Sequence, residues 1–220
     1  MKKDGTILII GIVCINLAVV LIFFANGVRA EFRTFYRLFA LLGLVAMYIS
    51  AILTPFQREL YKIFNKPFLK IHHASAIAGL ALVTAHPVLF AIEQAILNNA
   101  STGAAVFLPK FDTAYNFWSL AGRPAFYIIY LAFAAFFLRK IWKKGWRWLH
   151  ALNYIAILIA TIHGIIIGSD FYNFHGAVKD FIPGLLMNIL FLVLISITHI
   201  SFTIKRIDML KRMRKKKLVE

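Results

Sequence analysis

Long apolar stretches separated by short polar segments dominate the chain. Six of them lie at 7–24, 38–55, 71–92, 117–138, 148–169 and 181–204. A transmembrane helix needs about 20 predominantly apolar residues, and in hydrocarbon every backbone polar group needs a partner within the protein. Several stretches are apolar on all sides, so periodicity alone does not identify them as helices. Their length and spacing predict an all-α membrane protein, a bundle of six transmembrane helices.

Composition supports the membrane class and excludes others. Of the 220 residues, 61% are apolar and 15% are charged, whereas a soluble domain is about 25% charged. A water-soluble globule, a disordered chain and a disulfide scaffold are therefore excluded, the last also because Cys14 is the single cysteine. The formal net charge of +16 would suggest nucleic acid in a soluble protein. Here the basic residues lie between apolar stretches, so we expect membrane lipid and no nucleic acid as a partner.

The basic residues alternate along the chain. The N-terminal segment, the loops after the second and fourth stretches and the C-terminal segment hold 19 of the 25 Lys and Arg residues, and the other loops hold five. The positive-inside rule then predicts a multi-pass protein of the cytoplasmic membrane with both termini cytoplasmic. We expect one transmembrane domain, 1–204, and a basic cytoplasmic tail, 205–220. Anionic lipid is the favoured contact of the tail, and a soluble partner is the alternative.

Five histidines lie within or at the edge of the apolar stretches, where an ionisable side chain is costly enough to suggest a function. His72 and His86 are 14 residues apart, which places them within about 40° on one helix face and about 21 Å apart along the axis. His150 and His163 are 13 residues apart, or about 19.5 Å. Both stretches cross in the same direction, so the four histidines form two pairs at matched depths. For His199, a hydrogen bond to a neighbouring helix is an equal alternative.

Two axial imidazoles from facing helices, at each of two depths, are what two b-type haems require. A zinc or copper site instead needs three or four ligands within one small sphere. The 13-residue spacing is about 140° off one face, so the fifth helix must bend, over-wind or present its histidines at different angles. His73 is the alternative to His72 as a ligand, since it also lies near the inner boundary.

The segments 70–87 (KIHHASAIAGLALVTAHP) and 146–164 (WRWLHALNYIAILIATIHG) resemble the two haem-bearing helices of the ferric reductase-like transmembrane domain superfamily. That superfamily includes ferric-chelate reductases, NADPH oxidases and the membrane haem subunit of the periplasmic methionine sulfoxide reductase system. The resemblance covers nearly the whole chain. It implies His72 and His150 as ligands of an inner haem iron, and His86 and His163 as ligands of an outer one.

The resemblance also implies a function: transmembrane electron transfer through two b-type haems, from a cytoplasmic or membrane donor to an outer acceptor. The acceptor would be ferric iron, oxygen or a partner reductase. Only 16 residues follow Ile204 and no Gly-rich dinucleotide motif occurs, so we expect an oxidoreductase component without its own FAD- and NADPH-binding domain. The donor would be a separate flavoprotein or the quinol pool, with flavin or quinone as a further cofactor.

Two alternative functions stay open. One is a quinol-oxidising membrane subunit of a larger complex. The other is a histidine-lined cation or proton pathway without haem. The lack of Asp and Glu in the cores of the third and fifth stretches counts against it.

Two further charged residues are candidates for the outer site. Arg123 lies about 9 Å below the outer surface, where its guanidinium either pairs with a haem propionate or extends to the headgroups. Glu93 lies seven residues beyond His86, close to the same helix face. It either holds a substrate cation or water near the outer haem or, as we favour, is a solvated carboxylate at a helix end.

Overall fold

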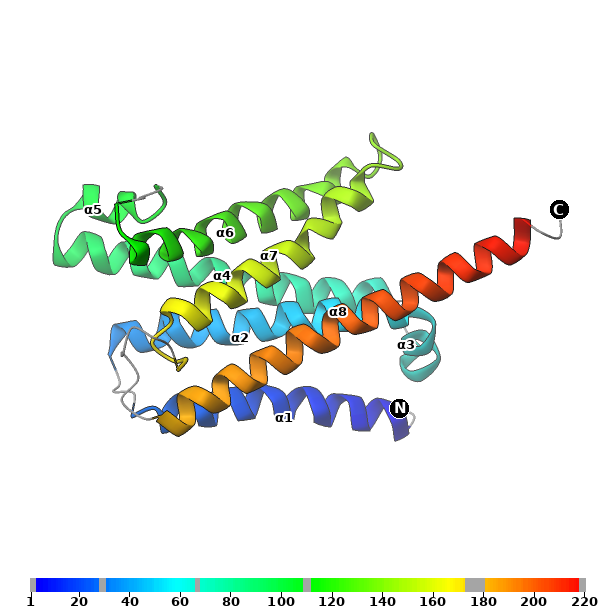
Figure 1. Ribbon diagram of the computed structural model, residues 1–220, viewed down its shortest axis with the longest axis horizontal. Helices are drawn as coiled ribbons and strands as arrows, with labels where there is room; N and C mark the ends of the chain where they lie inside the picture. Colours follow the sequence, from blue (N-terminus) through cyan, green and yellow to red (C-terminus); the bar gives the residue numbers. More distant parts are fainter. Residues whose placement is uncertain (1–2, 28–30, 66–67, 109–111, 173–180, 218–220) are drawn as a thin grey trace.

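The computed structural model describes residues 3–27, 31–65, 68–108, 112–172 and 181–217. Every regular element in these ranges is helical (Figure 1), so the predicted all-α class is confirmed for them. The long helices are α1 (Lys3–Ala25), α2 (Phe32–Leu53), α4 (Phe68–Leu97), α6 (Ala114–Leu138), α7 (Trp146–Ile167) and α8 (Phe181–Lys217). The short ones are the 3-10 turn η1 (Thr54–Phe56), α3 (Gln57–Phe64) and α5 (Ala100–Ala105).

Five of the helical segments described are long and apolar enough to cross a membrane. They contain α1, α2, α4, α7 and α8. Helix α6 adds a shorter apolar stretch, Arg123–Leu138, within the part of the chain considered. The helices are thus those of a membrane protein, by their length and composition.

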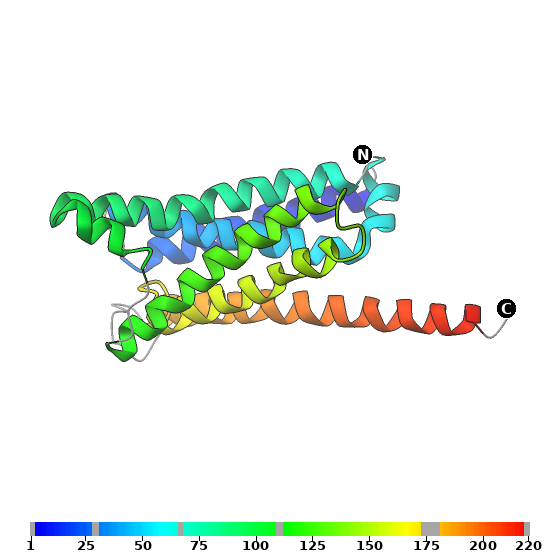
Figure 2. The same cartoon turned by 90° about the horizontal axis from the view of Figure 1, so that it is seen from above.

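The helices form a bundle in which two antiparallel pairs are packed closely, α2 with α4 and α6 with α7 (Figures 1 and 2). Helices α1 and α8 contact each other and α2. The start of α1 and the end of α8 lie at the same end of the bundle, together with α3 and the turn between α6 and α7. We name this the inner end and the opposite one the outer end.

Helix α2 is the centre of the apolar core. Its Tyr48 and Val45 are fully buried, as are Phe23 of α1, Phe191 of α8 and Ile157 of α7. Helix α4 differs, because Gly79 is its only buried position among the residues whose exposure is described. Helix α4 contributes partly buried residues that pack against this core, Ile71, Leu80 and Val83.

Helix α2 begins earlier than the sequence predicted, at Phe32 instead of 38. The two arginines in this added part find acidic partners inside the protein. Arg33 Nε lies 3.6 Å from Glu93 Oε1, and the Arg37 guanidinium forms an ion pair with Asp170. Charges that suggested a loop are thus accommodated within the helix.

Helix α8 also exceeds its predicted length, because it continues through the basic segment to Lys217. The beginning of this extension is attached to the bundle. Lys205 Nζ lies 3.0 Å from Glu59 Oε1 and 4.7 Å from the centre of the Phe56 ring. Figure 2 shows the last turns of α8 projecting beyond the other helices at the inner end.

Candidate functional site

The candidate site begins with two facing histidines near the start of α4 and α7. His72 and His150 are each the fifth residue of their helix. Their ring centroids are 6.0 Å apart, and the ring planes are inclined by 76°. Two imidazoles that share one metal ion through nitrogen bonds of about 2 Å have their centroids about 6 Å apart. We name this the inner pair; its ring separation is compatible with two ligands on opposite sides of one metal ion and is also that of an ordinary edge-to-face ring contact.

The neighbouring His73 has different surroundings. Its ring lies 5.3 Å from that of Phe136 on α6, in an edge-to-face arrangement, and 5.9 Å from His72. The ring that meets His150 is that of His72. This geometry favours His72 over His73 as the partner of His150.

The outer pair consists of His86 and His163. The two imidazoles are close enough to interact electrostatically. Helix α7 is uninterrupted from Trp146 to Ile167, so histidines 13 residues apart leave it at different angles. The structure thus brings both histidines of the uninterrupted α7 within reach of α4.

Backbone carbonyl groups define the tautomer of two histidines. His86 Nδ1 lies 3.0 Å from the backbone oxygen of Tyr36, and His150 Nδ1 lies 3.1 Å from that of Ala132. Since a carbonyl oxygen only accepts, Nδ1–H donates in both bonds and Nε2 of the neutral ring keeps its lone pair. Metal-binding histidines are commonly oriented by such bonds from the second ring nitrogen. His86 and His150 therefore share this feature with metal-binding histidines.

Helix α2 supplies hydrogen-bond partners for the two α4 histidines of the candidate pairs, His72 and His86. His72 Nδ1 lies 2.8 Å from the Ser50 hydroxyl, and the carbonyl of Tyr36 serves His86 in the same way. Ser50 and Tyr36 are 14 residues apart, as are His72 and His86. Because α2 and α4 are antiparallel, equal spacing on both helices brings each partner to the depth of its histidine.

A glycine lies midway between the two contacts on each helix. A Cβ atom added to Gly43 of α2 would lie 2.8 Å from the backbone nitrogen of Val83, and one added to Gly79 of α4 would lie 3.1 Å from Cγ of Met47. Such distances show that the two helices approach closely at their centres. The close approach lets short polar groups of α2 reach imidazole rings on α4.

Tyr36 and Glu93 extend the contacts of the outer pair. The Tyr36 hydroxyl donates to Glu93 Oε2 over 2.8 Å, and the Tyr36 ring lies 5.8 Å from those of His86 and Phe90. The Glu93 side chain is 11% exposed and also faces Arg33. Our preference for a solvated Glu93 carboxylate is therefore wrong, because this carboxylate is bonded within the protein.

The ion pair between Arg37 and Asp170 lies at the same end of α2. Both carboxylate oxygens accept from the guanidinium, and the Asp170 side chain is only 7% exposed. Asn26 Nδ2, just after α1, donates to the Asp170 backbone oxygen over 3.3 Å. Sequence reasoning missed this pair. The residues are 133 positions apart. The only hint in the sequence was that the segments assigned to the outer side contain acidic residues that could pair with the arginines there.

Two other residues named from the sequence lie away from the pairs. The Arg123 guanidinium donates to the backbone oxygen of Leu108, so its proposed propionate contact stays a prediction. His199 Nδ1 lies 2.9 Å from the oxygen of Ile195 in its own helix, and its ring lies 6.4 Å from Tyr154 of α7. The contacts of His199 are those of a packed helix residue.

The two helices that carry the inner and outer pairs, α4 and α7, are not packed closely against each other. Helix α4 packs along α2, and α7 packs along α6, while α4 and α7 are not among the closely packed helix pairs of the described chain. The two helices that carry the histidines therefore meet through side chains, without close backbone packing. A haem between them would receive one ligand from each helix, with the porphyrin supplying the other four.

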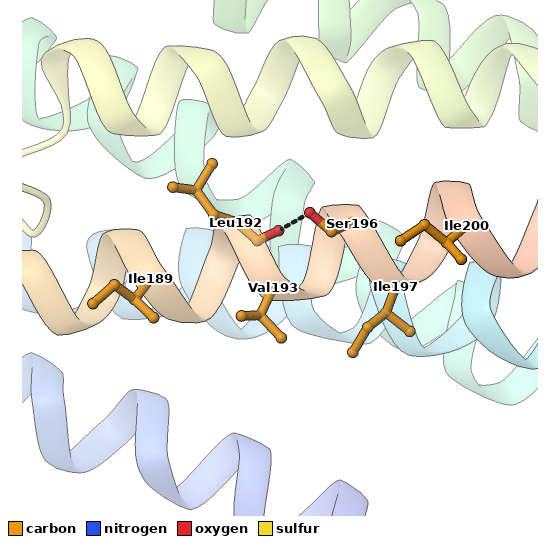
Figure 3. A pocket seen from close by; sticks show the side chains of 6 residues that line it. All are labelled: Ile189, Leu192, Val193, Ser196, Ile197 and Ile200. Atoms are coloured by element: carbon orange, nitrogen blue, oxygen red, sulfur yellow. Dashed lines mark hydrogen bonds between the residues drawn. The ribbon is translucent and has the colours of Figure 1, made fainter.

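Within the described residues, no three or more His, Cys, Asp or Glu side chains are grouped so that they could hold a metal ion. The structure instead brings the candidate histidines together in pairs. A shallow apolar hollow of about 330 Å³ lies elsewhere, on α8 (Figure 3), and its lining is Ile189, Leu192, Val193, Ser196, Ile197 and Ile200. The Ser196 hydroxyl there donates to the Leu192 oxygen over 2.7 Å, so the hollow presents an apolar surface suited to lipid.

Comparisons with known proteins add no relative: no family model, curated protein or solved structure matches this chain.

Proposed function

We propose that this chain is a transmembrane electron carrier that binds two b-type haems, one between the inner pair and one between the outer pair. The observation that carries the proposal is the inner pair, whose two imidazoles face each other at 6.0 Å from different helices. The Nδ1 bonds of His86 and His150 support it, because they leave Nε2 available as a ligand. Bound haem would supply reversible one-electron chemistry at two depths.

In this proposal the residues of the chain bind and orient. The four histidines would hold the two haem irons, and α2 orients His72 and His86 on α4 through Ser50 and Tyr36. Along α4 the two ligands are separated by about 21 Å, most of the hydrocarbon thickness of about 30 Å. The two sites together would therefore connect the two sides of a membrane.

We further propose six spans, with α6 as the fourth, and cytoplasmic termini in a cytoplasmic membrane. The uneven distribution of Lys and Arg supports this orientation. The start of α1 and the end of α8 lie together at the inner end of the bundle, which supports an even number of crossings. Electrons would enter at the inner end from a flavoprotein or quinol and leave at the outer end to ferric iron, oxygen or a partner reductase.

Electron transfer into sealed liposomes tests the function. The purified haem-loaded chain is reconstituted with ferricyanide trapped inside, a membrane-impermeant reductant is added outside, and the loss of ferricyanide absorbance is followed. The wild-type chain should reduce the trapped ferricyanide much faster than empty liposomes do. His86→Ala and His163→Ala should abolish the acceleration, whereas His199→Ala should keep it. A fully haem-loaded wild-type chain that gives no acceleration would contradict the proposal.

A further inference from the structure

Tyr36 is the residue through which α2 contacts the outer pair. Its ring is 6% exposed and lies between the rings of Phe32, at 6.3 Å, and of His86 and Phe90, both at 5.8 Å. Its hydroxyl donates to Glu93, and its backbone oxygen accepts from His86 Nδ1. One residue thus holds α4 at two places, through its side chain and its main chain.

The contacts on α4 lie on one face of that helix. His86, Phe90 and Glu93 follow the spacing i, i+4 and i+7, which aligns side chains along a helix. Glu93 is itself held by Arg33, one turn before Tyr36. The two helices are therefore linked by alternating partners, from Arg33 through Glu93 and Tyr36 to His86.

The location in the helix explains why such an anchor matters. Tyr36 is the fifth residue of α2, and helix ends fray within their first turns. A backbone carbonyl in this region holds a histidine ring firmly only where a side chain fixes the helix. The inner His72 has a different arrangement, since the side chain of Ser50 contacts it directly.

We propose that Tyr36 and Glu93 are positioning residues for His86. Glu93 fixes the Tyr36 hydroxyl, and the fixed tyrosine keeps its backbone carbonyl in place as the acceptor for His86 Nδ1–H. Nε2 of His86 is thereby directed toward His163. The inference rests on the proposed function, since its consequence is firmer retention of a haem at the outer pair.

The test measures the rate at which each haem leaves the purified protein for an excess of apomyoglobin. Changes in the bonds that orient a metal ligand commonly weaken metal binding about 10–100-fold. Tyr36→Phe and Glu93→Ala should each accelerate the loss of one haem about tenfold or more and leave the other haem at its wild-type rate. The accelerated component should be the one that His86→Ala removes.

Two variants separate positioning from general packing. Glu93→Gln should keep the wild-type rate, because the amide oxygen still accepts from the tyrosine hydroxyl. Tyr130→Phe is the matched control: its hydroxyl contacts Thr84, two residues before His86, over 2.6 Å, without contacting a histidine of either pair. The double variant Tyr36→Phe/Glu93→Ala should lose haem no faster than the single variants, because the two residues act as one unit.

The outcomes distinguish this inference from the function on which it rests. Two haems retained at wild-type rates in both Tyr36→Phe and Glu93→Ala would overturn the positioning role and leave the proposed function intact. Glu93→Gln losing haem as fast as Glu93→Ala would also overturn it, because charge would then matter and the tyrosine bond would not. A folded wild-type chain that binds no haem would overturn both proposals.

Discussion

Single hydrogen bonds orient three of the four histidines of the candidate pairs, His72, His86 and His150. At His86 and His150 a backbone carbonyl requires the proton on Nδ1, and at His72 the Ser50 hydroxyl occupies Nδ1. At His86 and His150, Nε2 of the neutral ring therefore keeps its lone pair. His73 has ring contacts with Phe136 and His72, so its neighbours provide packing.

Alanine substitutions of the two adjacent histidines should therefore differ. His72→Ala should remove one haem per chain, because it removes half of the inner pair, while His73→Ala should retain both haems. The measurement is the pyridine haemochrome content per mole of purified protein. Loss of a haem in His73→Ala together with full content in His72→Ala would assign the inner ligand to His73.

The ion pair of Arg37 and Asp170 should be important for stability. Removing one partner leaves the other charge without compensation in a largely buried site, which costs about 3–5 kcal/mol. Asp170→Asn should accordingly lower the thermal unfolding temperature in detergent by several degrees. The control is Glu59→Gln. Glu59 and its partner Lys205 are both more exposed, so this substitution should lower the free energy of unfolding by less than about 1 kcal/mol. Equal effects of the two substitutions would contradict this account of the outer end.

Much of the candidate site was accessible from the sequence, because the four histidines were identified by spacing and depth. Their partners Ser50 and Tyr36 were not, although these also lie 14 residues apart. Equal spacing on two helices becomes informative only when it is known that the helices pack against each other and whether they run parallel or antiparallel. The bond between Tyr36 and Glu93 depends on that same packing.

At the scale of helices, the close contact of α2 and α4 brings the partners and the histidines together. The contact is closest at Gly43, where an added Cβ would lie 2.8 Å from Val83 main-chain nitrogen. The backbone of α4 cannot give way there without moving the helix. At Gly79 the atoms that an added Cβ would meet belong mainly to the flexible Met47 side chain, so that position is more tolerant.

Gly43→Ala should therefore push α2 and α4 apart. Overpacking of this kind costs about 1–3 kcal/mol, and both bonds from α2 to the histidines of α4 should weaken as well. Thermal unfolding in detergent and haem content of the same sample measure the two effects. Gly11→Ala is the control, because no atom lies within 4 Å of its added Cβ. A Gly43→Ala variant as stable and as haem-loaded as Gly11→Ala would contradict the close-contact interpretation.

Helix boundaries were the less predictable part of the fold. The apolar stretches marked the long helices. Charged residues, however, were taken to lie outside the helices, so one helix was predicted to begin at 38 and another to end at 204. Arg33 and Arg37 lie inside α2 because partners distant in sequence compensate them. Helix α8 continues past Lys205, which contacts Glu59 and Phe56. Local sequence contains no sign of such distant partners.

The two ends of the molecule differ in the segments that meet there and in their charged residues. The start of α1, the end of α8, the turn between α6 and α7 and the start of α4 lie at the inner end, and these segments hold most of the basic residues. Arg33, Glu93 and the ion pair of Arg37 and Asp170 lie toward the outer end. The two histidine pairs thus have different charged surroundings.

The orientation makes a direct prediction about accessibility. In a Cys14→Ser background, a cysteine at Ser101 in α5 should react with a membrane-impermeant maleimide in intact cells, because α5 lies at the outer end. A cysteine at Lys143, in the turn between α6 and α7, should react only after the cells are opened. The opposite pattern would reverse the orientation, and labelling of both sites in intact cells would contradict the six-span topology.

The central claim is that the facing histidines bind haem, and a reduced-minus-oxidised absorption spectrum of the purified protein tests it most directly. Haem content should be determined on the same sample, from cells supplied with ample haem. We expect a b-type spectrum and close to two haems per chain, one for each histidine pair. A folded protein without a haem signal would contradict the claim.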